Sequence, residues 1–245
     1  MQHITKRLLS FRDFNSLENT LISRNKRPRK LTLEYIYIFP LVYVVPFIPI
    51  FHALFEESYP LILFFIVFLS GISFWNTAIF SFSFWSNFFP FIISSPLSLD
   101  RIIFYKYYRM VLEVLLVSII SMGIVWFTSI DFTLFLVFAV YNLGIGSLIV
   151  LFIASMNISR CDLTKGVRMN FEGWGFTQYS VLYLNLLIPS SLFFILSDQL
   201  GTRNAKFILL GMSVIVFMFH RFFVFLIYKN FMNRKYKILT VFRGN

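Results

Sequence analysis

The residues best placed to do chemistry in this chain are two charged side chains inside an apolar run. Arg109 and Glu113 stand four positions apart and are the only charged residues between 107 and 128. On a helix this spacing places them on one face, where they can form a salt bridge. Charged groups inside membranes are candidates for proton or substrate sites. Because this pair lies near an expected interface, a local ion pair is the favoured interpretation.

The sequence indicates no other reactive group. The histidines His3, His52 and His220 have no partner at metal-ligand spacing, and Cys161 is the single cysteine. The chain contains no phosphate-binding loop, nucleophile elbow, zinc-protease pair or dinucleotide fingerprint. We therefore expect no catalytic residue, no metal and no cofactor, and an intramembrane enzyme is the weakest function class considered.

The elements that position these residues are expected to be membrane helices. The chain is 58% hydrophobic and 13% charged over 245 residues, with a mean hydropathy of +0.76, which lies outside the range of soluble domains. A span needs roughly 20 apolar residues. The expected spans cover residues 34–54, 60–83, 107–128, 132–156, 177–197 and 206–228. The fold class is therefore an all-α polytopic membrane protein with six transmembrane helices.

The basic residues predict the orientation. Of the 22 Lys and Arg residues, 20 lie in the N-terminal segment, the two loops after the even-numbered spans and the C-terminal end. Only Arg203 and Lys206 fall on the other side. The positive-inside rule then places both termini in the cytoplasm. Since no folded basic module is present, nucleic acid is not an expected partner.

The N-terminal segment, residues 1–33, shows a helical stripe of apolar residues. Its members recur every three or four positions with basic residues between them: Ile4, Leu8, Phe11, Phe14, Leu17 and Leu21. This pattern is typical of an amphipathic helix in the membrane interface, or of a helix packed on a neighbouring domain. The remaining divisions are a transmembrane domain over 34–228 and a basic tail over 229–245.

The second apolar stretch is longer than a membrane requires. A continuous helix from Leu61 to Ile93 would reach roughly 50 Å at 1.5 Å per residue, so the chain must break or project. Pro90 and Pro96 can break it. The residues from Ser98 to Arg101 then predict a short cytoplasmic helix capped at Ser98, which could be a connector or a partner-docking element.

Glycines and prolines mark other positions in the spans. Gly144 and Gly146 are expected to allow close helix packing. Pro189 is expected to kink the fifth span, although kinks alone are weak support for transport.

Several segments, in order along the chain, resemble one family. They are Leu21-Ile22-Ser23-Arg24-Asn25-Lys26-Arg27-Pro28-Arg29, Trp85-Ser86 with Phe88, Pro96-Leu97-Ser98, Lys106-Tyr107, Asn170-Phe171-Glu172-Gly173 with Gln178, and Arg234-Lys235-Tyr236-Lys237 with Phe242-Arg243. The set resembles a group of uncharacterised bacterial membrane proteins of the ABC type-2 transporter permease-like class. Typical members are about twice as long, and this chain resembles their C-terminal half.

The resemblance implies the permease subunit of an ATP-driven transporter, mostly exporters, in the bacterial inner membrane. ATP hydrolysis would occur in a separate ABC ATPase subunit, and the half-permease would pair with itself or a paralogous half. The ATPase-coupling helix would fall at about 90–105, with Pro96, Leu97, Ser98, Leu99, Asp100 and Arg101 as contact residues. A membrane scaffold that recruits cytoplasmic partners without transporting anything is the alternative.

Overall fold

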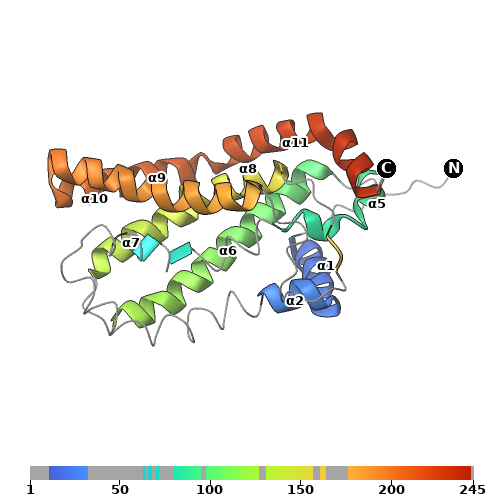
Figure 1. Cartoon of the computed structure of the whole chain (residues 1–245), viewed down its shortest axis with the longest axis horizontal. Coiled ribbons are helices and arrows are strands. Elements are labelled where there is room, and N and C mark those ends of the chain that lie inside the picture. Colours follow the sequence, from blue (N-terminus) through green and yellow to red (C-terminus); the bar gives the residue numbers. More distant parts are fainter. Residues whose placement is uncertain are drawn as a thin grey trace.

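The computed structural model of the chain describes residues 11–32, 63, 66–67, 70–71, 80–94, 98–126, 131–156, 161–163 and 176–243 (Figure 1). Within these residues every regular element is helical and no strand occurs, which confirms the all-α class. The expected span at 34–54, and most of that at 60–83, lie outside the described residues. The elements are α1 (Phe11–Arg24), α2 (Lys26–Thr32), η3 (Ser83–Trp85), α5 (Phe89–Ser94), α6 (Leu99–Trp126), α7 (Phe132–Tyr141), η4 (Asn142–Gly146), α8 (Ser147–Met156), α9 (Phe176–Leu200), α10 (Thr202–Met218) and α11 (His220–Arg243).

Helices α7 and α8 form one continuous helix with a π-helical insert, η4, between them. This candidate span runs from Phe132 to Met156, the bounds predicted from the apolar run. Asp131 caps its start, because its Oδ1 accepts hydrogen bonds from the backbone N–H groups of Thr133 and Leu134 at 2.9 and 3.2 Å. Such caps satisfy donors that the first turn of a helix leaves free.

A close contact between α7–α8 and α10 occurs at Gly144. A Cβ atom added there would lie 2.4 Å from the Ser213 carbonyl oxygen of α10. Only glycine permits this approach, so the packing role expected for Gly144 is confirmed.

Helices α9 and α10 form an antiparallel hairpin that turns at Gly201. Gly201 has a φ of 81°. A positive φ is unfavourable for any residue that has a side chain, so glycine suits this position. Helix α9 passes through Pro189 as a single helix.

The helix expected at 206–228 is not continuous. The structure has two helices there, α10 and α11, which meet at Phe219 with a bend of 63°. No proline or glycine lies at this point. Instead, His220 Nδ1 lies 2.7 Å from the Phe217 carbonyl oxygen, so the side chain bonds a backbone group of the last turn of α10. Phe219 itself has a ψ of 13°, away from helical geometry.

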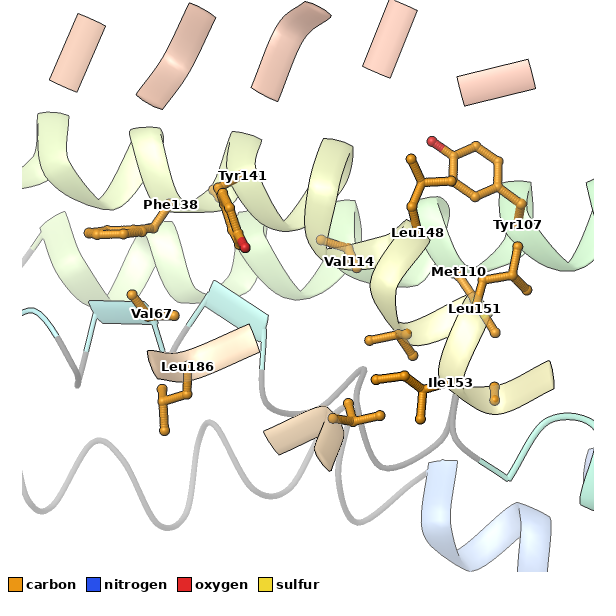
Figure 2. Packing of buried hydrophobic residues seen from close by; sticks show 14 of the residues in the cluster. Val67, Tyr107, Met110, Val114, Phe138, Tyr141, Leu148, Leu151, Ile153 and Leu186 are labelled. Carbon is orange, nitrogen blue, oxygen red and sulfur yellow. The ribbon is translucent and has the colours of Figure 1, made fainter. Parts of the chain in front are cut away.

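The core lies between α6, α7, α8, α9 and α11. Figure 2 shows its side chains meeting from four of these elements: Met110 and Val114 from α6, Phe138 from α7, Leu148 and Leu151 from α8, and Leu186 from α9. All six are buried. Their packing holds the helices side by side.

The outward faces of α9 and α10 are apolar as well. Large side chains such as Leu187, Ile195, Phe207 and Ile215 are half or more exposed. By length and composition, two described helices could cross a membrane, Phe132–Met156 and Tyr183–Leu200, or three if the bent α10–α11 pair is one span. These helices support a membrane protein.

One end of the bundle is rich in basic residues. Helices α1 and α5 and the C-terminal part of α11 lie at one end, and the α9–α10 turn lies at the other (Figure 1). The first end carries basic residues of α1, α2, α6 and α11, including Arg101, Lys106, Arg234 and Lys237. We call it the basic end.

Candidate functional site

The candidate site lies at the basic end, where α1, residues 80–94 and the first turns of α6 meet. Aromatic residues form the contact. The ring of Phe14 lies 5.8 Å from that of Trp85 and 5.6 Å from that of Tyr105, and Phe14, Trp85 and Ile102 form a buried cluster. Helix α1 is therefore packed on the protein through part of the predicted stripe. Leu17, another member of the stripe, is 60% exposed.

Lys106 is the most enclosed charge of the site. Its side chain is only 2% exposed, and its Nζ donates to Glu18 Oε1 at 2.9 Å and to the Ser81 carbonyl oxygen at 3.0 Å. The ammonium also lies over the Trp85 ring, 3.7 Å from its centroid. One cation thus joins α6 to α1 and to the segment before η3.

This enclosure shifts the pKa of Lys106. Burial lowers the pKa of Lys106 below its usual value, and the adjacent Glu18 carboxylate opposes that shift. The ion pair and the Ser81 carbonyl keep the ammonium hydrogen-bonded, and a buried charge requires such partners.

Arg109 makes the second link between α6 and α1. Its Nε donates to Glu113 Oε1 at 3.1 Å, and its Nη1 donates to Asn15 Oδ1 at 2.8 Å and Asn19 Oδ1 at 3.0 Å. The Arg109–Glu113 pair is thus a local ion pair on one helix face that also holds α1. Lys106 and Arg109, about one helical turn apart on α6, together fix α1 to α6.

The expected coupling segment has a different local structure from the one predicted. Leu99, Asp100 and Arg101 form the first turn of α6, and the Ile102 N–H donates to the Ser98 carbonyl oxygen at 3.3 Å. A separate short helix at 98–101 is therefore wrong. Leu99 is partly buried against the Phe14–Trp85–Ile102 cluster. Pro96 and Leu97 lie outside the described residues.

The short helix in this region is α5, six residues at Phe89–Ser94. Its Phe89 is buried and contacts Phe231 and Phe242 of α11, with ring centroids 5.9 and 5.2 Å apart. Phe88 and Phe91 are instead 50% and 70% exposed. We call Phe91 of α5 and Phe88, the residue directly before that helix, the aromatic pair of α5.

Sequence reasoning missed both Glu18–Lys106 and the aromatic pair. Glu18 and Lys106 are 88 positions apart, so no local spacing connects them. Phe88, Phe89 and Phe91 stand close together in a largely apolar stretch, so the sequence does not indicate which of these rings are exposed.

A metal centre is not indicated among the residues that the structure describes. They contain no group of three or more His, Cys, Asp or Glu side chains able to hold a metal ion. His220 bonds Tyr108 instead, with the Tyr108 hydroxyl 3.1 Å from its Nε2. Cys161 is buried in a small cluster with Phe80, Phe84 and Leu163.

Comparisons with known proteins give one match, to a family. No curated protein and no solved structure matches the chain. The family that matches is described as a family of unknown function, DUF5687, and the match covers residues 3–245. The chain belongs to the DUF5687 family.

Proposed function

We propose that this protein is the permease subunit of an ATP-driven transporter of the ABC type-2 class, an exporter that works as a half-permease. It would span the bacterial inner membrane six times, with both termini in the cytoplasm. A separate ABC ATPase would supply the energy, and a second copy or a paralogous half would complete the pathway. The resemblance of the ordered motifs supports this class.

The observation that carries the proposal is the exposed aromatic pair of α5 beside a fixed helix junction. Phe88 and Phe91 form an apolar surface at the basic end. Small docking surfaces commonly have an apolar centre and a polar rim, and Asp100 and Arg101, both partly exposed, lie nearby in sequence at the start of α6.

The junction also offers a route for movement. Phe89 ties α5 to α11, while Lys106 and Arg109 tie α1 to α6. A force applied by an ATPase at α5 would reach α11 through Phe89. We therefore move the coupling element from Ser98–Arg101 to α5.

The direct test is docking of an ATPase. The tagged protein is purified from its native host in mild detergent, and co-purifying proteins are identified by mass spectrometry. We expect an ABC ATPase in stoichiometric amount and ATP hydrolysis by the complex. Phe91→Asp should lower ATPase recovery by at least tenfold, since burying an unpaired carboxylate costs roughly several kcal/mol.

Leu17→Asp is the matched control, because Leu17 is similarly exposed at the same end but lies on α1. It should leave ATPase recovery unchanged. The proposal would be overturned if an ATPase never co-purifies, or if Phe91→Asp recovers it as well as the unmodified protein does.

The orientation has its own test. Because basic loops stay in the cytoplasm, the basic end should be inside. In a Cys161→Ser background, Thr202→Cys should react with an impermeant maleimide added to intact cells, and Lys235→Cys should react only after lysis. The reverse pattern would contradict the orientation.

A scaffold is the second candidate, and the closed charge network favours it. The charged groups of Lys106 and Arg109 are held by several partners each, which suits a static junction. A scaffold would retain a cytoplasmic partner through the same aromatic pair, but the complex would hydrolyse no ATP.

A further inference from the structure

A second polar site lies inside the helix bundle, beside the π-helical element η4. Asn142 of η4 and Asn185 of α9 are both fully buried. Asn142 Nδ2 donates to Ser70 Oγ at 2.8 Å, and Asn185 Nδ2 donates to the Val181 carbonyl oxygen at 3.2 Å. Neither Oδ1 atom has a hydrogen-bond partner among the residues that the structure describes. Buried polar atoms without partners are rare and require an explanation.

The two amide oxygens converge on Gly146. A Cβ atom added to Gly146 would lie 2.8 Å from Asn142 Oδ1 and 3.2 Å from Asn185 Oδ1. Both oxygens therefore approach the same side of the Gly146 backbone, more closely than a residue with a side chain would allow. π-Helical turns inside α-helices occur frequently at functional sites.

Three serine hydroxyls of this region donate to backbone carbonyls. Ser70 Oγ donates to the Val67 carbonyl oxygen at 3.0 Å, and Ser147 Oγ donates to that of Leu143 at 2.7 Å. Ser213 Oγ donates to the Leu209 carbonyl oxygen at 2.7 Å. Pro189, four residues after Asn185, has no N–H to donate to the Asn185 carbonyl. The site is thus rich in oxygen acceptors.

The chemistry of these ligands favours a monovalent cation. Carbonyl-type oxygens are hard ligands that suit alkali and alkaline-earth ions, and broken membrane helices coordinate Na⁺ with such oxygens. Neither η4 nor the facing part of α9 from Val181 to Pro189 contains a carboxylate. A divalent ion would keep its charge uncompensated in this apolar setting.

We propose that Asn142 Oδ1 and Asn185 Oδ1, beside Gly146, form a binding site for one Na⁺ ion that joins η4 to α9. Water molecules and the hydroxyl lone pairs would complete its coordination. The site goes beyond the permease proposal and does not depend on it, because it lies away from the aromatic pair and needs no ATPase.

The test measures Na⁺ on the full-length protein in lipid nanodiscs. Binding of ²²Na⁺ should saturate near one ion per chain, with choline chloride holding the ionic strength constant. The thermal midpoint should rise with Na⁺ and not with choline, since a ligand that binds only the folded state stabilises it.

Two variants and one control locate the ion. Gly146→Ala fills the space between the two oxygens, and Asn185→Leu removes one oxygen at similar volume. Each should weaken Na⁺ binding by roughly tenfold or more, the scale on which even indirect changes affect metal sites. Gly211→Ala is the control, because a Cβ there meets nothing within 4 Å, and it should bind Na⁺ normally.

Several results would overturn the proposal. If the unmodified protein shows no saturable ²²Na⁺ binding, a water molecule or a direct bond between the two amides satisfies these oxygens instead. Equal Na⁺ binding by Gly146→Ala and Gly211→Ala would place the ion elsewhere. The binding measurement on the unmodified protein decides the first point even if a variant fails to fold.

Discussion

The Lys106 ammonium lies 2.9 Å from the Glu18 carboxylate, although the two residues are 88 positions apart in the chain. The contact crosses from α6 to α1 in a place where both side chains are largely excluded from solvent. In a membrane protein whose apolar surfaces can face lipid, such a pair specifies which surface of α1 meets α6. Its contribution is therefore to the arrangement of the helices as much as to their stability.

Removing one partner of this pair should be more harmful than removing both. Glu18→Gln leaves the Lys106 ammonium buried without a counter-charge, and breaking a buried pair costs about 3–5 kcal/mol. We expect a large fall in the thermal midpoint in nanodiscs. The double variant Glu18→Leu with Lys106→Met should recover most of the loss, because it leaves no uncompensated charge.

Lys237→Met, on an exposed position of α11, is the control and should have little effect. A double variant as unstable as Glu18→Gln alone would mean that the charges do not act as a pair.

Gly144 should tolerate no side chain. In Gly144→Ala the new methyl group would meet the Ser213 carbonyl oxygen at 2.4 Å, so α10 must move away. Overpacking of this kind costs about 1–3 kcal/mol. Gly211→Ala, in α10 with open space around the added atom, should be neutral or slightly stabilising. Equal thermal midpoints for the two variants would argue against the close approach.

His220 should set the bend between α10 and α11. His220→Leu removes the bond to the Phe217 carbonyl, which then becomes free to accept a helical N–H. We expect α10 and α11 to straighten, lengthening the distance between spin labels at Arg203→Cys and Lys237→Cys in a Cys161→Ser background. Tyr108→Phe keeps the bond to Phe217 and removes only the Tyr108 hydroxyl, so it should preserve the bend. Unchanged distances in His220→Leu would assign the bend to packing.

The sequence was informative where the apolar pattern is continuous and its ends are marked. The stretch Phe132–Met156 was predicted with its observed bounds, because its apolar run is continuous, and in the structure Asp131 caps its start. The bend at Phe219 was not predictable, since no proline or glycine marks it and the His220 side chain bonds a backbone carbonyl there. The coupling helix was predicted to be short and capped at Ser98, but the helix that begins at Leu99 continues to Trp126 as α6.

Side-chain partners across the fold were beyond sequence reasoning. Arg109 and Glu113 could be paired because four residues separate them on one helix. Asn15 and Asn19, which also bond Arg109, come from another helix and carry no local signal. The unpartnered oxygens of Asn142 and Asn185 depend on how η4 and α9 pack, which only the structure provides.

Asp131 should make the far end of the bundle sensitive to acid. Burial alone would raise the pKa of Asp131, but hydrogen bonds from Lys206, Thr133 and Leu134 lower it below its usual value of 3.8. A carboxyl group with a lowered folded-state pKa contributes stability that is full above about pH 4 and is lost as the pH falls through the folded-state pKa. Asp131→Asn keeps the cap but removes the charge. The thermal midpoints of Asp131→Asn and the unmodified protein should therefore differ at pH 7 and converge near pH 2.

The difference at pH 7 should be small, within about 1 kcal/mol, because the Asp131 side chain is 46% exposed and solvent screens the pair. Lys206→Met is the second single variant of a double-mutant cycle, since Lys206 donates to both Asp131 and Thr133. In the Lys206→Met background, Asp131→Asn should have less effect at pH 7. A difference that persists unchanged down to pH 2 would show that the Asp131 charge does not contribute to the contact between α7 and α10.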